Sequence, residues 1–455
     1  MLQVIYLLNE GFLKLGVKIP EVLLPQKEID LYKWAVVACD QYTAEPDYWE
    51  QVAQLVGDAP STLNLVFPEV YLGKGAETER IKRIHQNMLQ YLNNEVVYSC
   101  GAGLIYLQRQ TSQAACRQGL IIAVDLERYD YHRGSKSLIR ATEGTVLERI
   151  PPRVKIREGA RLEMPHIMVL IDDPDCRVIE PLASQTGDFQ CLYETELMMN
   201  GGSIRGYLLQ DEPVLEKIYH SLADLVEPGC FNRKYGVNDE PPFLFAVGDG
   251  NHSLATAKAV WENIKRQPGV DLVNHPARYA LVEVVNIHDP GLRFEPIHRV
   301  LFKVSARELF EAMGAYFGAE QFTLEKFADL REMEDRLNTD RAKDENRCRI
   351  GFVNEEGYGM LTITNPQSDL EVGAVQSFLD EWLTQYPETE IDYIHGSEVV
   401  RKLGSKPGNI GFFLPALPKS ALFKTVIRDG VLPRKSFSMG EAEEKRFYLE
   451  CRRIG

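Results

Sequence analysis

The sequence predicts a mixed α/β fold, in which helices flank a central sheet and a further α/β region follows toward the C-terminus. A mixed α+β arrangement is the alternative. Mid-chain, strand-length apolar segments alternate with segments of helical periodicity, as in "PPFLFAV", "SLATAKAVWENIK" and "ARYALVEVVNI". The 455 residues exceed what one average domain needs. Hydrophobic residues make up 44% and charged residues 26%, which is ordinary for a globular protein with a sizeable core.

The first 300 residues contain clear element patterns. Helices are expected at about residues 46–56, in "ETERIKRIHQNMLQYLNNE" and in "EPVLEKIYHSLADLV". Strands are expected at residues 33–39 and in "GLIYLQRQ", "GLIIAVDLERY" and "IMVLIDDP". Residues 132–166 lie between strands and are dense in Arg, Lys and Glu. This segment is either a solvated linker or a folded loop that handles an anion.

The pattern changes after about residue 303. Helices with charged faces are expected in "ARELFEAMGAYF" and "FADLREMEDRLNT", and a hairpin in "RIGFVNEEGYGMLTIT". A further helix is expected in "GAVQSFLDEWLTQY" and a further strand in "IDYIHG". The tail again alternates between apolar and polar segments. We therefore predict two domains, residues 1–303 and residues 304–455.

Charge and cysteine content narrow the class of protein. A net charge of -15 argues against a broad grip on nucleic acid, which needs a basic face. None of the eight cysteines forms a CxxC pair, which favours a reducing compartment and disfavours a structural zinc site. No apolar stretch approaches the length of a membrane span. We expect a cytoplasmic protein with a small-molecule substrate and neither a nucleic-acid nor a membrane partner.

The most specific stretch is "FLFAVGDGNHSLATAKAVWENIK", residues 243–265, where a buried strand turns into a helix. The first N–H groups of a helix have no internal partner, and the helix dipole is positive there, so this start can attract an anion. Gly248 and Gly250 allow the turn and a close approach of a ligand. Asn251 and Ser253 would then join these glycines in contacting phosphate.

Asp249 and His252 have two interpretations each. Asp249 either caps the helix, as Asn251 also could, or holds a metal ion or takes a proton. His252 is either a polar residue at a helix start or a partner of Asp249 at one ligand. The loop differs from a Walker loop, since the chain has no GxxxxGK[ST] motif.

Two further segments carry candidate residues. In "RFEPIHRVLF", His298 and Arg299 are either a surface pair or a source of proton transfer and a planar phosphate clamp. In "VLPRKSFSMG", Lys435 and Ser436 either line an oxyanion pocket or are simply exposed.

Together, "VGDGNHSLATA", "EPIHRVLF" and "VLPRKSFSM" resemble, in the same order, signature segments of domain-of-unknown-function family one thousand and fifteen. The resemblance covers nearly the whole chain, and "LIRATEGT" matches an upstream segment. The family loop is similar to DGHHRYETA, so this chain has Asn251 for a histidine, Ser253 for an arginine and Ala255 for a glutamate. We therefore consider Arg299 as a replacement clamp and Glu143 as a replacement acid. The resemblance also implies that the tail folds back to complete the site.

The loop also resembles that of the ParB and sulfiredoxin-like superfamily, whose members bind nucleotide phosphates at such a helix start. One branch phosphorylates free serine. This resemblance implies a nucleotide-dependent phosphotransferase that acts on serine or a related metabolite and uses ATP or ADP with Mg²⁺. Asp249 or Glu143 would be the base or the metal ligand, while Arg299 and Lys435 would neutralise charge.

Two other functions remain open from the residues. A metal-dependent hydrolase, such as a phosphatase, would use Asp249, His252, His298 and Glu143, whose side chains suit a divalent ion. A non-catalytic metabolite sensor would use the same loop for binding alone.

Overall fold

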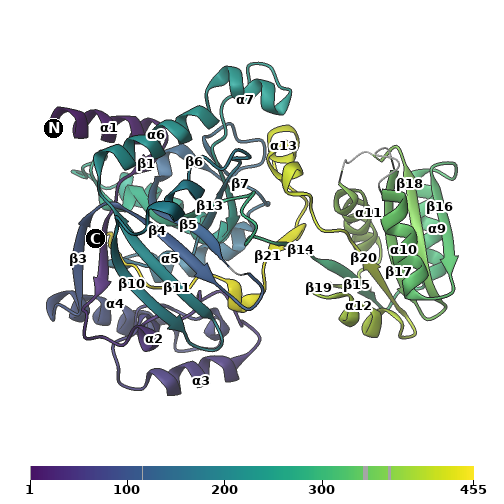
Figure 1. Ribbon diagram of the computed structural model, residues 1–455. Helices are drawn as coiled ribbons and strands as arrows, with labels where there is room; N and C mark the ends of the chain where they lie inside the picture. The colour runs from purple at the N-terminus through teal and green to yellow at the C-terminus, as the bar shows by residue number, and fades with distance from the viewer. Residues whose placement is uncertain (1, 115, 342–346, 367–369) are drawn as a thin grey trace. The chain divides into compact units, whose positions relative to one another are not determined.

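The computed structural model describes residues 2–114, 116–341, 347–366 and 370–455, and it divides the chain into two compact units. The first unit contains Met1–Arg293, Phe423–Val431 and Met439–Gly455 (Figure 1). The second contains Phe294–Leu422 and Leu432–Ser438. The structure thus differs from the predicted boundary at residue 303. The segment directly after Arg293 already pairs within the second unit, and two C-terminal segments return to the first.

A ten-stranded mixed sheet organises the first unit. Its strands are, in spatial order, β10 (Gln190–Leu197), β11 (Gly202–Leu209), β4 (Leu104–Gln110), β5 (Arg117–Asp125), β13 (Tyr279–Asn286), β9 (Met168–Ile171), β12 (Phe245–Asp249), β7 (Ile139–Ala141) and β6 (Tyr129–Asp130), with β1 (Val17–Lys18) paired to β5. β12 runs parallel to β7 and antiparallel to β9. This arrangement confirms the predicted central sheet flanked by helices.

Side chains on both faces of this sheet are buried. Along β5, Ile121 packs into one core, whereas Leu120 and Ile122 pack into the other. This alternation follows from the two-residue period of a strand. Because both faces are covered, the strands of the centre are continuous apolar runs. The helices of the first unit are α1 (Leu2–Lys14), α2 (Leu31–Trp34), α3 (Pro46–Val56), α4 (Glu77–Asn93), α5 (Ile150–Arg157), α6 (Glu212–Leu225), α7 (Pro228–Tyr235), α8 (Asn251–Lys265) and most of α13 (Lys419–Asp429).

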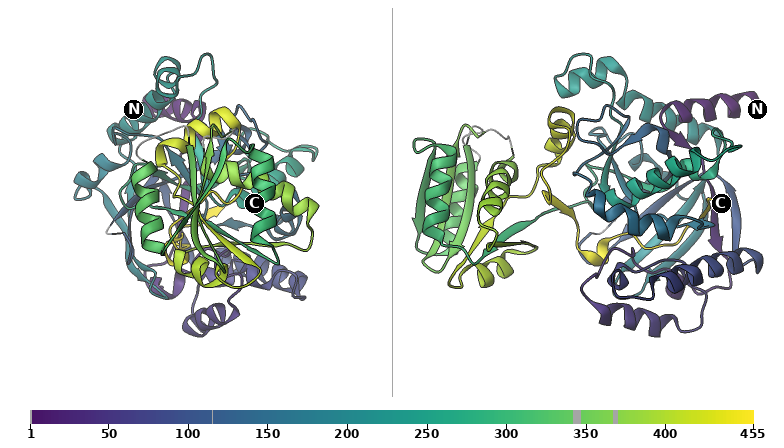
Figure 2. Two further views of the ribbon diagram at one scale, coloured as in Figure 1. Left: turned by 90° about the vertical axis from the view of Figure 1, so that its right-hand side faces the viewer. Right: turned by 180° about the vertical axis from the view of Figure 1, so that it is seen from behind.

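The second unit is a six-stranded sheet with helices on both faces (Figure 2). Its strands are, in order, β16 (Phe322–Phe327), β18 (Gly357–Thr364), β17 (Arg347–Asn354), β20 (Asn409–Phe413), β15 (His298–Phe302) and β19 (Glu390–Ile394). Its helices are α9 (Ala306–Phe317), α10 (Leu330–Arg341), α11 (Glu371–Gln385) and α12 (Ser397–Gly404). On β17, Val353 packs with residues of α10 and α12, while its neighbour Phe352 contacts Phe310 of α9.

Three two-stranded sheets complete the fold. They pair β2 (Glu21–Pro25) with β3 (Val97–Ala102), β8 (Leu162–Glu163) with β22 (Arg452–Arg453), and β14 (Phe294–Pro296) with β21 (Phe437–Met439). β22 belongs to the C-terminal tail, which the sequence predicted to fold back.

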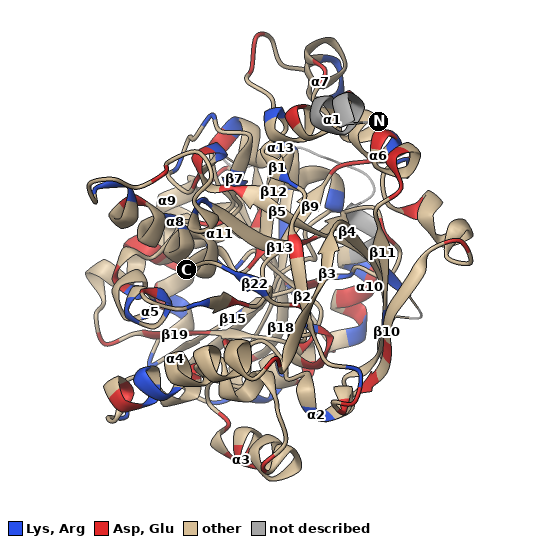
Figure 3. Ribbon diagram, turned by 90° about the vertical axis from the view of Figure 1, so that its left-hand side faces the viewer, with Lys and Arg blue, Asp and Glu red and all other residues tan. Residues whose placement is uncertain are grey.

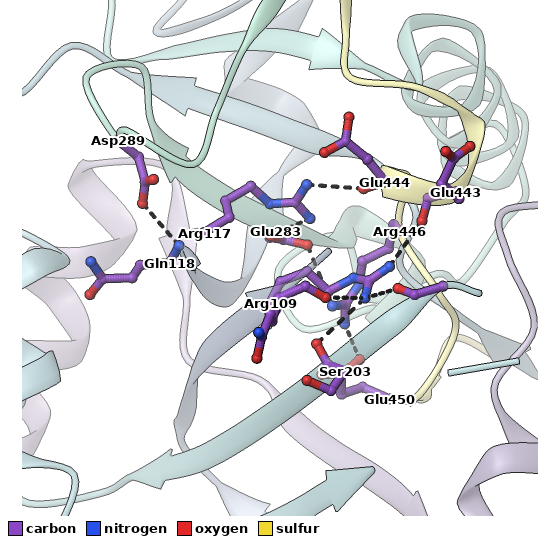
Figure 4. A network of polar contacts seen from close by, with 12 residues as sticks. Arg109, Arg117, Gln118, Ser203, Glu283, Asp289, Glu443, Glu444, Arg446 and Glu450 are labelled. Carbon is purple, nitrogen blue, oxygen red and sulfur yellow. Dashed lines mark hydrogen bonds and ion pairs between the residues drawn. The ribbon is translucent and has the colours of Figure 1, made fainter. Parts of the chain in front are cut away.

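Buried ion pairs attach this tail to the large sheet. The Arg446 guanidinium lies between Glu283 of β13 and Glu450, and all three side chains are at most 1% exposed (Figure 4). Arg109 of β4 donates to the main-chain oxygen of Glu443, at 3.0 Å. The backbone of the tail also accepts a hydrogen bond from the indole N–H of Trp34, at the Leu449 oxygen. The tail is therefore part of the core of the first unit.

Several predicted elements are confirmed, and others are not. The helix predicted at residues 46–56 is α3, the one in "ETERIKRIHQNMLQYLNNE" is α4, and the predicted hairpin is β17–β18. The strand predicted at residues 33–39 is wrong, because α2 ends at Trp34 and only Val37 forms a β-bridge, with Phe447 of the tail. These residues are apolar because they lie in the core under the tail. β10 and β11 were not predicted.

Acidic and basic residues are interspersed along the chain in the view of Figure 3, in which α4, for example, carries both. Within the described residues, no helix combines enough length and hydrophobicity to cross a membrane. The eight cysteines are free thiols.

Candidate functional site

The turn between β12 and α8 is built around Gly250. This residue has φ +77°, in the left-handed region that favours glycine. A Cβ atom there would also lie 3.0 Å from Cγ1 of Ile167. The backbone angle of the turn therefore favours glycine, and a side chain here would also need Ile167 to shift. It ends at Asn251, where α8 begins.

Two segments meet at this end of the large sheet, the one that follows β12 and the one that follows β7. Because β7 is parallel to β12, the residues that follow β7 lie beside those that follow β12. Thr142 donates to the Val247 oxygen at 2.6 Å, and the N–H of Val146 donates to Nε2 of His252 at 3.3 Å. Glu143 lies between these two contacts in the chain and is half-buried. The loop with Glu143 is thus adjacent to the turn.

Asp249 forms an ion pair with Lys445 from the tail. The Lys445 Nζ lies 3.1 Å from Asp249 Oδ2, and the side chains are 10% and 26% exposed. The N–H of Gly250 donates to Asp249 Oδ1 at 2.9 Å. Burial by itself would raise the pKa of Asp249, but the charge and hydrogen bond of Lys445, with the Gly250 N–H, outweigh it and lower the pKa. Asp249 is therefore a carboxylate at neutral pH.

The first residues of α8 are half-buried, and its start has no side-chain cap among the described residues. The N-cap residue is Gly250, and no side-chain hydrogen bond caps this helix within the described chain. Asp249 and Asn251, which the sequence offered as alternative caps, therefore do not cap it. The Asn251 amide donates to the Val247 oxygen at 3.3 Å, while its Oδ1 is buried without a hydrogen-bond partner among the described residues. The turn thus combines main-chain donors, a carboxylate, a cation and a buried amide oxygen.

Ser253 belongs to a different set of contacts. Its hydroxyl shares a 2.7 Å hydrogen bond with Nε2 of His166, and Nδ1 of His166 lies 3.0 Å from the Tyr448 hydroxyl. The N–H of Cys39 donates to the same hydroxyl at 3.1 Å. His166 precedes β9, Tyr448 is in the tail and Cys39 follows α2, so with Ser253 four separate segments form this chain of hydrogen bonds.

The remaining predicted residues are in the second unit. The Arg299 side chain is fully buried and donates to Gln376, to the Ile297 oxygen and to the Arg434 oxygen. His298 accepts the N–H of Leu414 at Nδ1, 3.1 Å away.

Burial, with the charges of Arg299 and His395, lowers the pKa of His298 to about 4, so its imidazole is neutral at pH 7. Lys435 is exposed with φ +55°, while Ser436 is buried and donates to the Pro433 oxygen.

The sequence analysis missed Lys445, His166 and Tyr448. Lys445 is part of "EAEEKRFYLE", and nothing local distinguishes it from a lysine on the surface. His166 follows a proline just before a strand, which is a position beside the sheet edge and a weak signal. Among the residues that the structure describes, no three His, Cys, Asp or Glu side chains form a group that could hold a metal ion.

The chain matches the model of the family "Protein of unknown function (DUF1015)" over residues 22–382, and it therefore belongs to that family. No curated protein was found to be similar.

Solved structures that are similar include a free serine kinase mutant in complex with AMP, at 10% identity and TM-score 0.38, covering 75% of this chain and 94% of that chain. A conserved hypothetical protein from Pyrococcus furiosus is 13% identical, with TM-score 0.34, and the match covers 72% of this chain and 90% of that chain. C-terminally truncated SbnI from Staphylococcus aureus is 10% identical, with TM-score 0.34, and the match covers 70% of this chain and 82% of that chain. These likenesses are distant.

Proposed function

We propose that this chain is a phosphotransferase that binds the phosphates of ATP or ADP at the turn formed by Gly248–Ser253. It would transfer a phosphoryl group to the hydroxyl of a small metabolite, serine or a relative. One observation carries the proposal: the start of α8, which no described side chain caps, lies beside the Asp249–Lys445 ion pair. Phosphoryl transfer depends on positioning and on neutralising phosphate charge, and this turn holds donors and a cation for both tasks.

Each group at the turn has a role in this proposal. The N–H groups of the first turn of α8 and the Lys445 ammonium bind phosphate oxygens. Asp249, ionised at neutral pH, either accepts the proton of the attacking hydroxyl or holds Mg²⁺. The Asp249 carboxylate and the unpartnered Oδ1 of Asn251 are oxygen ligands of the kind that Mg²⁺ prefers. Mg²⁺, when bound with the nucleotide, would neutralise phosphate charge.

The other candidates keep their proposed roles. Glu143 is a second acid beside the turn, and His252 is a second proton carrier. The roles expected of His298, Arg299, Lys435 and Ser436, which belong to the second unit, stay predictions from the sequence. For Arg299 this role requires an exchange of hydrogen bonds, because its guanidinium already donates to three protein acceptors.

The first test is thermal stability with ATP, ADP and other nucleotides, each with and without Mg²⁺. A ligand that binds only the folded state raises the midpoint, by the equivalent of about 2.7 kcal/mol at a hundred times its dissociation constant. We expect this rise in the wild type and its loss in Lys445→Gln. Lys82→Gln, which removes an exposed lysine of α4, is the control and should respond like the wild type.

Transfer is measured as nucleotide product formed in the presence of serine and its analogues. Binding without turnover would favour a metabolite sensor. A rise of the midpoint with divalent metal alone would favour a hydrolase. No rise with any nucleotide, in a wild type that melts cooperatively, would contradict the proposal.

A further inference from the structure

A cavity of about 130 Å³ lies next to the first turn of α8, within the first unit. Apolar side chains form much of its wall, including Leu65, Phe67, Met88 and Ile156. His166 and Ser253 also line it, together with Tyr448. Its volume is below the roughly 300–1,000 Å³ of sites for drug-sized ligands, so it suits a small group.

The charges that line the cavity are compensated. Arg153 forms two parallel hydrogen bonds with Glu69, and its Nε lies 2.7 Å from Glu69 Oε1. Arg157 is paired with Glu163, which is buried and also contacts Arg452. Each arginine is thus already neutralised by a carboxylate. The cavity therefore favours a neutral, mainly apolar ligand and differs from the charged turn at Asp249.

The Ser253 hydroxyl reaches this cavity in the geometry of an activated nucleophile. A serine, a histidine 2.7 Å away and a third group that orients the histidine are the elements of nucleophilic catalysis. Tyr448 is the third group, since its hydroxyl lies 3.0 Å from Nδ1 of His166. For His166 to act as a base, its Nδ1–H donates to the Tyr448 oxygen, which leaves Nε2 without a proton. Burial raises the pKa of Tyr448 well above its ordinary value, so the phenol stays neutral.

We infer that Ser253 is a nucleophile with His166 as its general base, and that the cavity holds the acyl group of a small neutral ester. This acyl-transfer activity goes beyond the proposed phosphotransfer. In the proposed phosphotransfer, the main-chain N–H groups at the start of α8 bind phosphate. In the acyl transfer, the Ser253 side chain reacts with a ligand in the cavity. It is also specific to this chain, which has serine where the resembled loop has arginine. Tyr448 is a positioning residue, because it acts through His166.

The reaction proceeds in two balanced steps. Ser253 Oγ attacks the carbonyl carbon, its proton moves to Nε2 of His166, and the C–O bond to the leaving group breaks. The leaving alcohol takes the proton from His166, and an acyl-serine remains. Water then attacks this ester, gives a proton to His166, and releases the carboxylic acid as Ser253 regains its proton.

The test uses the full chain and a fluorophosphonate probe, which reacts with activated serines, followed by peptide mass spectrometry. We expect one adduct, on Ser253, in the absence of nucleotide. Ser253→Ala should lose it, and His166→Gln should slow labelling at least 100-fold, as expected for loss of a general base. Ser377→Ala is the control, because that helix serine donates to the Gly373 oxygen and should leave labelling unchanged.

Two further measurements test the roles of Tyr448 and Ser253. Tyr448→Phe should shift the pH profile of labelling, which a purely structural role would not do. Melting curves show whether each variant folds. Hydrolysis of a p-nitrophenyl ester of a short fatty acid should give a burst that disappears in Ser253→Ala. No adduct on Ser253 of the folded wild type would overturn the inference. Lys445→Gln separates the two activities, because it should lose nucleotide binding and keep labelling.

Discussion

Replacing Arg446 by methionine tests whether the tail is held by buried charge. The Arg446 guanidinium lies 3.4 Å from Glu283 and also pairs with Glu450, and both carboxylates are 0% exposed (Figure 4). Burial lowers the pKa of Arg446, but the two carboxylates outweigh it and raise the pKa, so this side chain stays charged. Methionine preserves much of the volume and removes the charge.

Breaking a buried ion pair on one side costs about 3–5 kcal/mol, because the remaining charge is left without compensation. Glu283 keeps a contact with Arg117 at 3.4 Å, and Glu450 keeps the Tyr193 hydroxyl, so we expect a loss within this range rather than twice it. A domain is stable by only about 5–15 kcal/mol, so the loss is a large part of the total.

Urea unfolding at pH 7, followed by tryptophan fluorescence, measures the free energy of unfolding. Arg205→Met is the matched control in the same unit, since the Arg205–Glu194 pair is more than half exposed and its loss should change little. The double variant Arg446→Met/Glu450→Gln should recover part of the stability, because the two sites are coupled. A loss below about 1 kcal/mol in Arg446→Met would refute the reasoning.

Three further predictions concern the backbone and the pH dependence of stability. An alanine in the left-handed region costs about 1–2 kcal/mol. Gly250→Ala should lower the free energy of unfolding by more than this amount, because its Cβ would also press on Ile167. Gly134→Ala, with φ +76° and open space around it, is the control and should cost only this amount in urea unfolding. Equal losses in the two variants would contradict the close contact at Gly250.

Burial raises the pKa of Asp172, but hydrogen bonds and charge from a histidine, a lysine and a tyrosine lower it to about 2. Its contribution to the free energy of unfolding, about 2 kcal/mol, is therefore present above pH ~4 and lost toward pH 2. The unfolding free energies of the wild type and of Asp172→Asn should therefore become equal as the pH falls.

The folded pKa of His298, about 4, is below its ordinary value, so the unfolded chain takes up the proton first. The free energy of unfolding therefore falls as the pH drops from about 6.5 to 4. His298→Gln should weaken this fall, and an unchanged pH profile would argue against it.

Much of the local structure could be predicted because it depends on neighbours in the chain. α4 follows from helical periodicity, the β17–β18 hairpin from alternating strands around a turn, and the turn at Gly250 from glycines between a strand and a helix. The strand predicted at residues 33–39 failed for a physical reason. Apolar residues show burial but not the partner, and here the partner is a tail more than 400 residues away.

For the site, the sequence by itself determined the strand, the turn and the helix start with Asp249 and His252, because these groups are adjacent in the chain and their spacing sets their geometry. Only the tertiary structure decided which cation meets Asp249. Lys445 is 196 residues away and reaches the turn because buried ion pairs hold the tail on the sheet. The same holds for Ser253 and His166, which are 87 residues apart. Their contact depends on strand order, since β9 lies next to β12 in the sheet, and no local pattern encodes that order.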